Sequence, residues 1–301
     1  MILVAAIFGS PALSSAQNAL PALYFKPAST SEMRTSFAEM DYRWPELHKG
    51  VPPLYIENIP EDFNQAVSTR VKKQMFFMAL LPMVLMANAE ILQERAEAID
   101  LLRRFDNEAM GSVEIERLTI LAKRYGLKNN VQPHKSFAEE LLRRIDQIPP
   151  SLALAQAANE SAWGTSRFAK QANNLFGEWT FTPGAGIVPK GRPEGATYEV
   201  RRFNSLYASI RSYLNNLNSH RAYRKLREIR SEMREQGHLF DGLQLAEGLK
   251  KYSERGQDYV KEIQSIIRGI DLARVNQTFL RESSENLLAL YTDLPGSLQA
   301  Y

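Results

Sequence analysis

Apolar residues recur at helical spacing between residues 61 and 150. One segment opens at Ser112 and closes at Gly126, with apolar side chains on a single helical face between them. Ser136 and Glu139 form a capping-box pattern ahead of a further segment of this kind. The pattern predicts a helical region over residues 61–150. Its apolar positions are Leu92, Ala96, Ile99, Leu102, Phe105, Leu118, Leu121, Ala122, Tyr125, Leu141, Leu142, Ile145 and Ile148.

A proline pair, Pro149-Pro150, ends this region, because proline interrupts the helical hydrogen-bond ladder. Ser151 follows and is expected to cap the next helix. That helix, residues 152–162, is rich in alanine, which allows neighbouring elements to pack closely. Glu160 lies near its C-terminal end, immediately before a Trp-Gly break. The spacing therefore places one carboxylate at an exposed helix end.

The flanking segments have other patterns. Residues 17–60 are rich in proline and serine and predict an extended lead segment. Residues 178–182 and 197–203 are β-prone and enclose a Gly- and Pro-rich loop, which predicts a long-looped hairpin. Helices are expected to resume at Ser205 and to continue to about residue 268, followed by a peripheral segment over 271–301. The predicted fold is mainly α (α+β), with a small long-looped β-hairpin.

Two apolar runs bear on location. Residues Met1–Ala16 are apolar and then small, which predicts a signal peptide and an exported, periplasmic or cell-envelope protein. The run has no Lys or Arg before its apolar part, so a buried or frayed N-terminal segment is the alternative. Met75–Ala87 is 13 residues long and contains Pro82. It is too short to span a bilayer and predicts a buried helix, with no stable transmembrane segment in the mature chain.

Composition narrows the chemistry. The 301 residues are 44% hydrophobic and 24% charged, as in an ordinary folded protein. A net charge of +3 is too small to indicate nucleic acid, although it suits an anionic polymer such as a cell wall. The absence of cysteine excludes disulfides, thiolate metal sites and cysteine nucleophiles. The four histidines are scattered and no phosphate-binding loop occurs, so neither a metal, a cofactor nor a nucleotide is expected.

Glu160 is the leading candidate for chemistry. A glutamate held between apolar groups at a helix end can have its pKa raised, and it can then donate a proton. The ordinary alternative is a solvated glutamate near a helix terminus. Aromatic neighbours, among them Trp163, Phe176 and Trp179, favour the functional interpretation, because aromatic side chains suit the faces of sugars.

Glu160-Ser161-Ala162-Trp163-Gly164-Thr165-Ser166 is followed by Asn173-Asn174-Leu175-Phe176-Gly177. This order resembles the catalytic segment of the peptidoglycan-cleaving N-acetylglucosaminidases of the lysozyme-like superfamily. It is most similar to the Bax-type, flagellar-muramidase-like proteins of glycoside hydrolase family 73. A weaker resemblance covers roughly residues 60–270. It implies a lysozyme-like helical domain with a core over 151–270. It also implies a hydrolase of β-1,4 bonds next to N-acetylglucosamine in peptidoglycan glycan strands, with Glu160 as general acid.

The resemblance leaves the second catalytic group open. Glu199 and Glu194 flank the second predicted strand, where the family places its second acid, and Glu178 replaces an apolar residue of the pattern. We rank them in the order Glu199, Glu194, Glu178, although each taken singly is typical of a surface charge. The N-acetyl group of the substrate is an alternative nucleophile. Tyr223 matches a tyrosine that the family keeps near its active site, and a half-buried helix tyrosine is its ordinary interpretation.

The expected substrate-binding residues surround this motif. Trp163 and Phe176 are expected to shape the floor of a cleft from the core. The basic run from His220 to Arg234 is expected to be mainly a solvated amphipathic helix. Two other functions remain open: a lytic transglycosylase, and a non-catalytic glycan-binding or scaffold protein on the same fold. The full substrate-binding set is Trp163, Asn173, Asn174, Phe176, Glu178 and Trp179.

Overall fold

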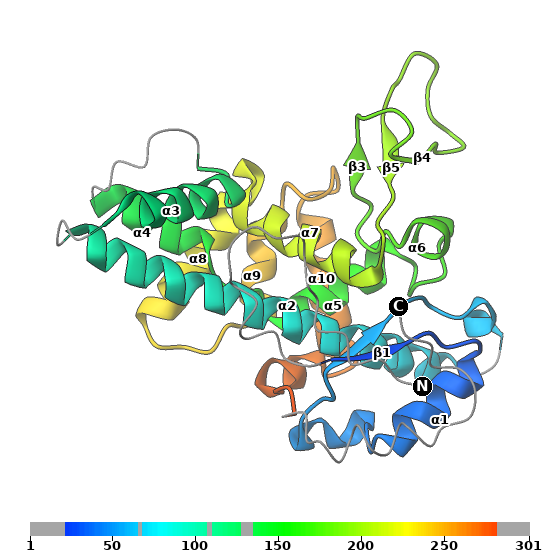
Figure 1. Cartoon of the computed structure of the whole chain (residues 1–301). Helices are drawn as coiled ribbons and strands as arrows, with labels where there is room; N and C mark the ends of the chain where they lie inside the picture. The colour runs from blue at the N-terminus through cyan, green and yellow to red at the C-terminus, as the bar shows by residue number, and fades with distance from the viewer. Residues whose placement is uncertain (1–21, 66–67, 107–109, 128–134, 282–301) are drawn as a thin grey trace. The chain divides into compact units, whose positions relative to one another are not determined.

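The computed structural model describes residues 22–65, 68–106, 110–127 and 135–281. The predicted signal peptide, Met1–Ala16, lies outside the described residues. The described chain is mainly α-helical, with a few short strands, as predicted (Figure 1). It forms two compact units. The first contains residues up to Met86, Ala157–Ile210 and residues from Gln277, and the second contains Ala87–Gln156 and Arg211–Asn276.

The unit boundaries differ from those predicted at residues 60, 150 and 270. Four described helices begin in one unit and end in the other, so no boundary coincides with a proline-rich joint. These helices are α2 (Thr69–Asp106), α5 (Pro150–Glu160), α7 (Leu206–Ser219) and the 3-10 helix η5 (Leu272–Gln277).

The first unit opens with short elements, and the predicted extended lead segment is wrong for them. Ser29 caps α1 by accepting a hydrogen bond from the Glu32 amide. Prolines prevent one long helix here, but they do not prevent short elements that bury apolar side chains such as Met33 and Phe37. The elements are β1 (Leu23–Phe25), α1 (Thr30–Glu39), η1 (Trp44–Lys49), β2 (Leu54–Ile56) and η2 (Glu61–Asn64), and β1 pairs with β2 in parallel.

Residues 278–281 are anchored on this N-terminal part. Val51 and Leu280 form a parallel β-bridge. The Arg281 guanidinium donates to the carbonyls of Met40 at 2.7 Å and Asp41 at 2.8 Å, the two residues that follow α1. The expected peripheral segment over 271–301 is therefore wrong for its described part. η5 (Leu272–Gln277), which precedes the anchor, also has buried apolar residues.

Helix α2 carries the apolar run Met75–Ala87. It is the described helix whose length and composition would allow it to cross a membrane, but 78% of its most apolar window is buried inside the protein. Phe76, Phe77 and Leu80 are fully buried. The run thus forms part of a protein core, in agreement with the predicted buried helix.

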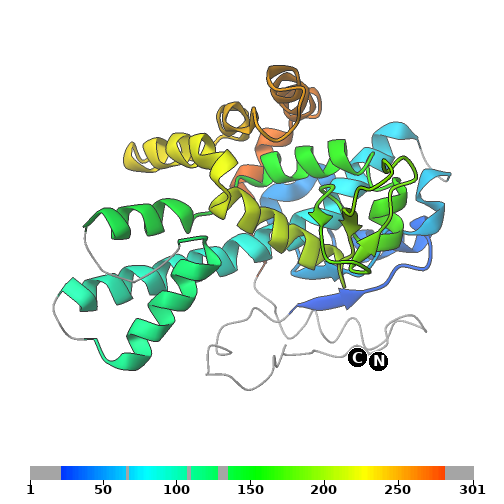
Figure 2. The same cartoon turned by 90° about the horizontal axis from the view of Figure 1, so that it is seen from above.

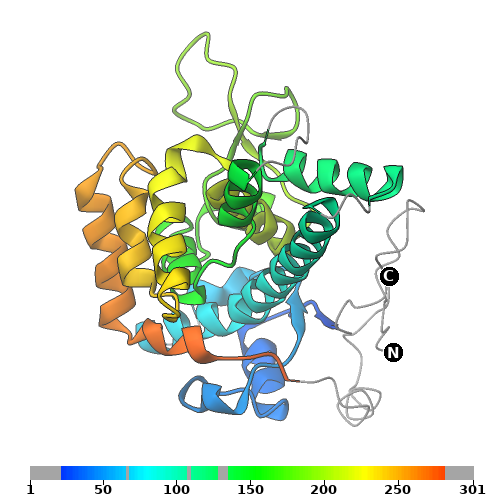
Figure 3. The ribbon, with the colours of Figure 1, turned by 90° about the vertical axis from the view of Figure 1, so that its left-hand side faces the viewer.

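The regular elements of the second unit are all helices in its described residues. α3 and α4 contact the C-terminal half of α2 (Figure 2), where Arg117 pairs with Glu97 and Arg95 donates to the Ile145 carbonyl at 2.8 Å. Helices α8, α9 and α10 pack against one another (Figure 3). The helices are α3 (Ser112–Arg124), α4 (Lys135–Arg144), η3 (Arg221–Tyr223), α8 (Arg224–Glu235), α9 (Gly242–Ala246), η4 (Glu247–Leu249) and α10 (Gln257–Gly269).

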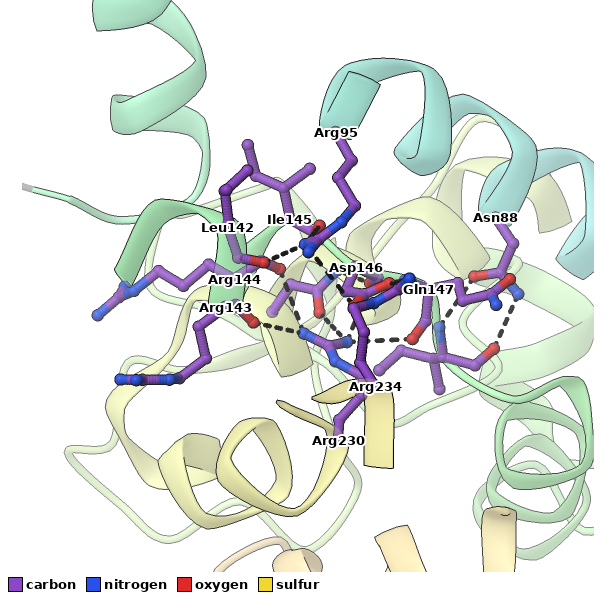
Figure 4. Close-up of polar contacts among 12 residues, drawn as sticks. Asn88, Arg95, Leu142, Arg143, Arg144, Ile145, Asp146, Gln147, Arg230 and Arg234 are labelled. Carbon is purple, nitrogen blue, oxygen red and sulfur yellow. Dashed lines mark hydrogen bonds and ion pairs between the residues drawn. The ribbon is translucent and has the colours of Figure 1, made fainter. Parts of the chain in front are cut away.

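A buried polar network holds the segment that leads into α5 (Figure 4). The Arg230 guanidinium donates to the carbonyls of Asp146 at 2.9 Å and Gln147 at 3.2 Å. Burial lowers the pKa of Arg230 to about 10. The Asp146 carboxylate pairs with Arg234 through two hydrogen bonds of 2.5 Å. Since the basic helix supplies these buried contacts, the prediction that it is mainly solvated is wrong for Arg230 and for Arg227, each 1% exposed.

The N-terminal half of α5 is fixed by side chains from distant parts of the second unit. Asn88 donates to and accepts from the backbone of Ile148. Ser151 does not cap α5 as expected, because the helix already begins at Pro150, a residue suited to a first helical turn. The Ser151 amide instead donates to the Asn276 side chain at 3.0 Å.

Candidate functional site

Helix α5 ends at Glu160 because the backbone then turns left-handed. Ala162, Trp163 and Gly164 have φ values of 49°, 61° and 76°. Left-handed residues other than glycine are uncommon, and each costs about 1–2 kcal/mol. Such strain persists only where surrounding contacts impose it, and it is often found at functional sites.

Hydrogen bonds impose this turn. The Ser161 hydroxyl donates to the Ala157 carbonyl at 2.6 Å and accepts from the Gly164 amide at 2.7 Å. The Trp163 amide donates to the Ala158 carbonyl at 2.8 Å. Ser161 is fully buried, so its hydroxyl satisfies backbone groups that water does not reach. These contacts explain why serine and glycine occupy their places in the motif.

Glu160 is half-buried at the rim of this turn. The Asn159 side-chain amide lies 3.3 Å from its Oε1 and donates to it. Gly164 brings the turn against α2, since a Cβ at this position would meet the Phe76 ring at 3.0 Å and Ile59 at 3.3 Å. The backbone turn that follows Glu160 is therefore held by hydrogen bonds and by packing against Phe76.

Trp163 packs against the first half of α2. Its ring lies 5.2 Å from that of Phe77 and 6.0 Å from that of Phe76, and Lys73 Nζ lies 4.4 Å above it. A cation over an indole face is attracted by the ring quadrupole. Trp163 thus has the core-shaping place expected for it, with its side chain half-buried.

Asn173 and Asn174 join the motif to the hairpin. Asn173 ends α6 (Arg167–Ala172) in the left-handed conformation and donates to the Phe203 carbonyl at 3.2 Å. Asn174 is 1% exposed. Its amide nitrogen donates to the carbonyls of Glu178 at 2.9 Å and Arg201 at 2.8 Å, and its oxygen accepts from the Glu178 amide at 3.0 Å.

Phe176 is 3% exposed and has the place in the core that was expected for it, whereas the predicted direct contact of Asn174 with substrate is wrong. Their side chains are enclosed by protein. The physical reason is that Asn174 uses its whole amide to fix the strands that follow. Both buried side chains support the backbone around the candidate site.

The hairpin contains three short strands, one more than predicted. β3 (Trp179–Thr180) and β5 (Glu199–Arg201) are antiparallel, as expected from the two β-prone segments. β4 (Gly186–Ile187) comes from the loop and pairs with the other edge of β5 (Figure 1). Gly186 is required there, because a Cβ would lie 2.3 Å from the Val200 carbonyl oxygen.

The three candidate second carboxylates have different surroundings. Glu199 is 8% exposed, and its two oxygens accept hydrogen bonds from the amides of Gly184 at 3.1 Å and Gly186 at 2.8 Å. Glu194 is exposed in the loop. Glu178 is half-buried and lies 3.8 Å from the Arg201 guanidinium. Glu199 thus holds the β4 loop to β5.

Trp179 and Tyr223 lie in different units. Trp179 is 58% exposed, and its ring stacks on Tyr198 with centroids 4.4 Å apart. Tyr198 was not among the residues expected at the site, although it lies in the second β-prone segment. Tyr223 belongs to the second unit, is 7% exposed, and contacts the ring of Tyr252 at 5.8 Å.

A half-buried carboxyl group is a type of side chain that enzymes use for proton transfer. The first unit holds a half-buried carboxylate at a strained, rigid turn, and a hairpin fixed by Asn174 follows in the chain. Among the residues that the structure describes, no group of three or more His, Asp or Glu side chains is placed to hold a metal ion.

Comparisons with known proteins agree with the motif. Residues 135–272 match the glucosaminidase family, described as mannosyl-glycoprotein endo-beta-N-acetylglucosaminidase. Protein bax of Escherichia coli K12 is 32% identical over 201 residues, which cover 66% of this chain and 69% of that protein. No solved structure matches the chain. The chain therefore belongs to the Bax-like glucosaminidases, a family of glycosidases that act on glycans.

Proposed function

We propose that this protein hydrolyses β-1,4 glycosidic bonds next to N-acetylglucosamine in peptidoglycan, with Glu160 as general acid. The observation that carries the proposal is the half-buried carboxylate at the left-handed turn Ala162–Gly164, in a chain of the glucosaminidase family. Cleavage of a glycosidic bond requires a proton on the leaving oxygen and stabilisation of an oxocarbenium-like centre. Protonated Glu160 supplies the proton.

The second requirement has four candidate groups. Glu199, Glu194 and Glu178 are the carboxylates of the hairpin region, and the substrate's N-acetyl group is the fourth. Both Glu199 oxygens accept backbone hydrogen bonds, so we assign Glu199 to holding the hairpin. Glu194 and Glu178 are then the candidate carboxylates for the second acid or base. Tyr223 is proposed to orient the N-acetyl group or a water molecule. Glutamine variants of the three glutamates test which group acts. An enzyme that uses the substrate's N-acetyl group retains activity when Glu194 and Glu178 are replaced, whereas an enzyme that uses one of these carboxylates loses it.

The test of the acid is Glu160→Gln. Glutamine keeps the size of the side chain but cannot donate the proton, and general acid catalysis typically contributes about 100- to 10,000-fold in rate. We expect a loss of this size in the release of fragments from purified peptidoglycan. Glu39→Gln, an exposed glutamate of α1, is the matched control and should leave activity unchanged. Retention of most activity by Glu160→Gln would show that another residue is the acid.

The products distinguish the enzyme classes. A hydrolase leaves reducing ends, whereas a lytic transglycosylase leaves anhydro-muramic ends. Wild-type protein that binds peptidoglycan and releases nothing would instead be a glycan-binding protein. Mass spectrometry of the released fragments gives this result directly.

We also propose that the protein is exported to the periplasm or cell envelope, as the apolar Met1–Ala16 segment suggests. The mass of the mature protein from its native host tests this. Cleavage after Ala16 is expected, and an intact Met1 in the envelope fraction would count against it.

A further inference from the structure

The small sheet of the first unit has one apolar face. In an antiparallel sheet, directly paired residues project to the same side, as do residues two apart along one strand. Trp179 and Ile187 both pair with Val200, and Tyr198 precedes Val200 by two positions. These four side chains share a face, whereas Glu199, between Tyr198 and Val200, projects to the other.

Part of this apolar face is open to solvent. Trp179 is 58% exposed, although its ring stacks on Tyr198 with an interplanar angle of 8°. Phe181, two residues beyond Trp179, is 70% exposed. We call Trp179, Phe181 and Tyr198 the aromatic platform. Large aromatic side chains gathered on a surface commonly mark a binding site, because their exposure to water is unfavourable.

The surroundings of the aromatic platform are mainly basic. The Arg192 guanidinium donates to the Tyr198 carbonyl at 3.2 Å, which holds this cation beside the stacked rings. Glu199 does not offset these charges at the surface, because it is buried and bonded to backbone amides. The exposed charged side chains that follow β4 and β5 include Lys190 and Arg202, against Glu194. Arg201 is not counted, because it projects to the face of Glu199 and pairs with Glu178.

We propose that the aromatic platform is a carbohydrate-binding surface that holds a glycan strand of the anionic cell wall while it is cleaved. The inference rests on the proposed function and names a further part of its substrate site. A pyranose ring has apolar C–H faces and polar edges, which match flat aromatic rings that carry an indole N–H or a phenol at one end. The basic rim is complementary to the carboxylates of the polymer.

A second copy of the chain fits this surface less well. Two copies that met at this surface would bring the Arg192 guanidinium and the exposed Lys190 of one copy close to those of the other. Like charges placed opposite each other in an interface are unfavourable. A glycan strand of the cell wall presents carboxylates instead.

Binding is measured in the Glu160→Gln background, so that turnover does not change the ligand. The probes are insoluble peptidoglycan in a sedimentation assay and soluble N-acetylglucosamine oligomers in isothermal titration calorimetry, which needs no fluorescent residue. We expect Trp179→Ala/Tyr198→Ala to weaken binding about tenfold, and Phe181→Ala about threefold. Trp179→Phe retains a flat ring and should restore most of the affinity. Leu239→Ala, an apolar residue that is 72% exposed outside the hairpin, is the control and should bind as its parent does.

Unchanged affinity of a folded double variant would overturn the proposal. If the double variant does not fold, Phe181→Ala alone decides, since so exposed a ring contributes little to folding. Light scattering that shows a dimer in the parent and a monomer in the double variant, with equal glycan binding, would assign the surface to self-association and overturn the proposal. Weakened binding by these variants with an inactive wild type would support the platform and reject only the proposed hydrolysis.

Discussion

At the scale of single residues, the motif consists of one candidate acid and several residues that shape the backbone. Ser161 and Gly164 form the turn after Glu160, and Asn174 fixes the hairpin. Only Glu160 among these four has both a titratable side chain and access to solvent. The specificity of the motif therefore reflects geometry as much as chemistry.

Gly164→Ala tests the turn. Its φ of 76° strains any other residue, and the new Cβ meets Phe76 at 3.0 Å, so a loss of about 1–3 kcal/mol in stability is expected. Gly177→Ala is the matched control, because Gly177 has a φ of 69° with nothing within 4 Å of a Cβ. Chemical denaturation should show a larger loss for Gly164→Ala. Equal losses would mean that Phe76 moves aside and that only the backbone matters.

At the scale of elements, side-chain hydrogen bonds fix the chain before and after the candidate motif along the sequence. The segment before α5 is held by Asn88 and Arg230 in the second unit. In the first unit, β3 and β5 are tied to the Asn173-Asn174 turn. Attachments of this kind are expected where a reacting group must keep its position, since small displacements lower catalytic rates strongly.

Asn174→Ala should loosen the hairpin. The change leaves the Glu178 amide and the carbonyls of Glu178 and Arg201 without their partner, at an expected cost of about 2–4 kcal/mol. Hydrogen exchange of amides in β3 and β5 should accelerate, while exchange in α10 stays slow. Asn204→Ala, an exposed asparagine just beyond β5, should exchange like the wild type. Unaltered protection in Asn174→Ala would show that strand pairing alone holds the hairpin.

At the scale of the whole molecule, the chain passes between two units through α2, α5, α7 and η5. The first unit is also closed on itself, because residues 278–281 return to η1 and the end of α1. Such a contact joins residues more than two hundred positions apart, as with Arg281 and Met40. Loss of this contact is therefore expected to lower the stability of the whole first unit.

Arg281→Ala tests this closure. The guanidinium donates to carbonyls at the ends of α1 and η1, and loss of such charge-assisted hydrogen bonds is expected to cost about 1.5–3 kcal/mol. The thermal midpoint should fall, and the Val51 amide, which donates to Phe279, should exchange faster. Arg268→Ala, exposed on α10, serves as the comparison and should change neither quantity. A midpoint equal to that of the wild type would show that the β-bridge holds the segment without Arg281.

The sequence by itself determined what depends on near neighbours along the chain. Helical spacing predicted α3 and α5, the β-prone segments predicted β3 and β5, and the order of residues around Glu160 indicated the family. These features arise from local backbone preference and periodicity, which a single sequence records.

Only the tertiary structure decided the partners of polar groups. Arg230 is a surface residue by composition, yet its helix packs so that the guanidinium reaches carbonyls more than eighty positions away. Asn174 and Glu199 became structural residues because backbone amides and carbonyls of the hairpin face them. The contribution of such hydrogen bonds to stability depends on desolvation and on groups distant in sequence, so residue spacing alone does not predict it.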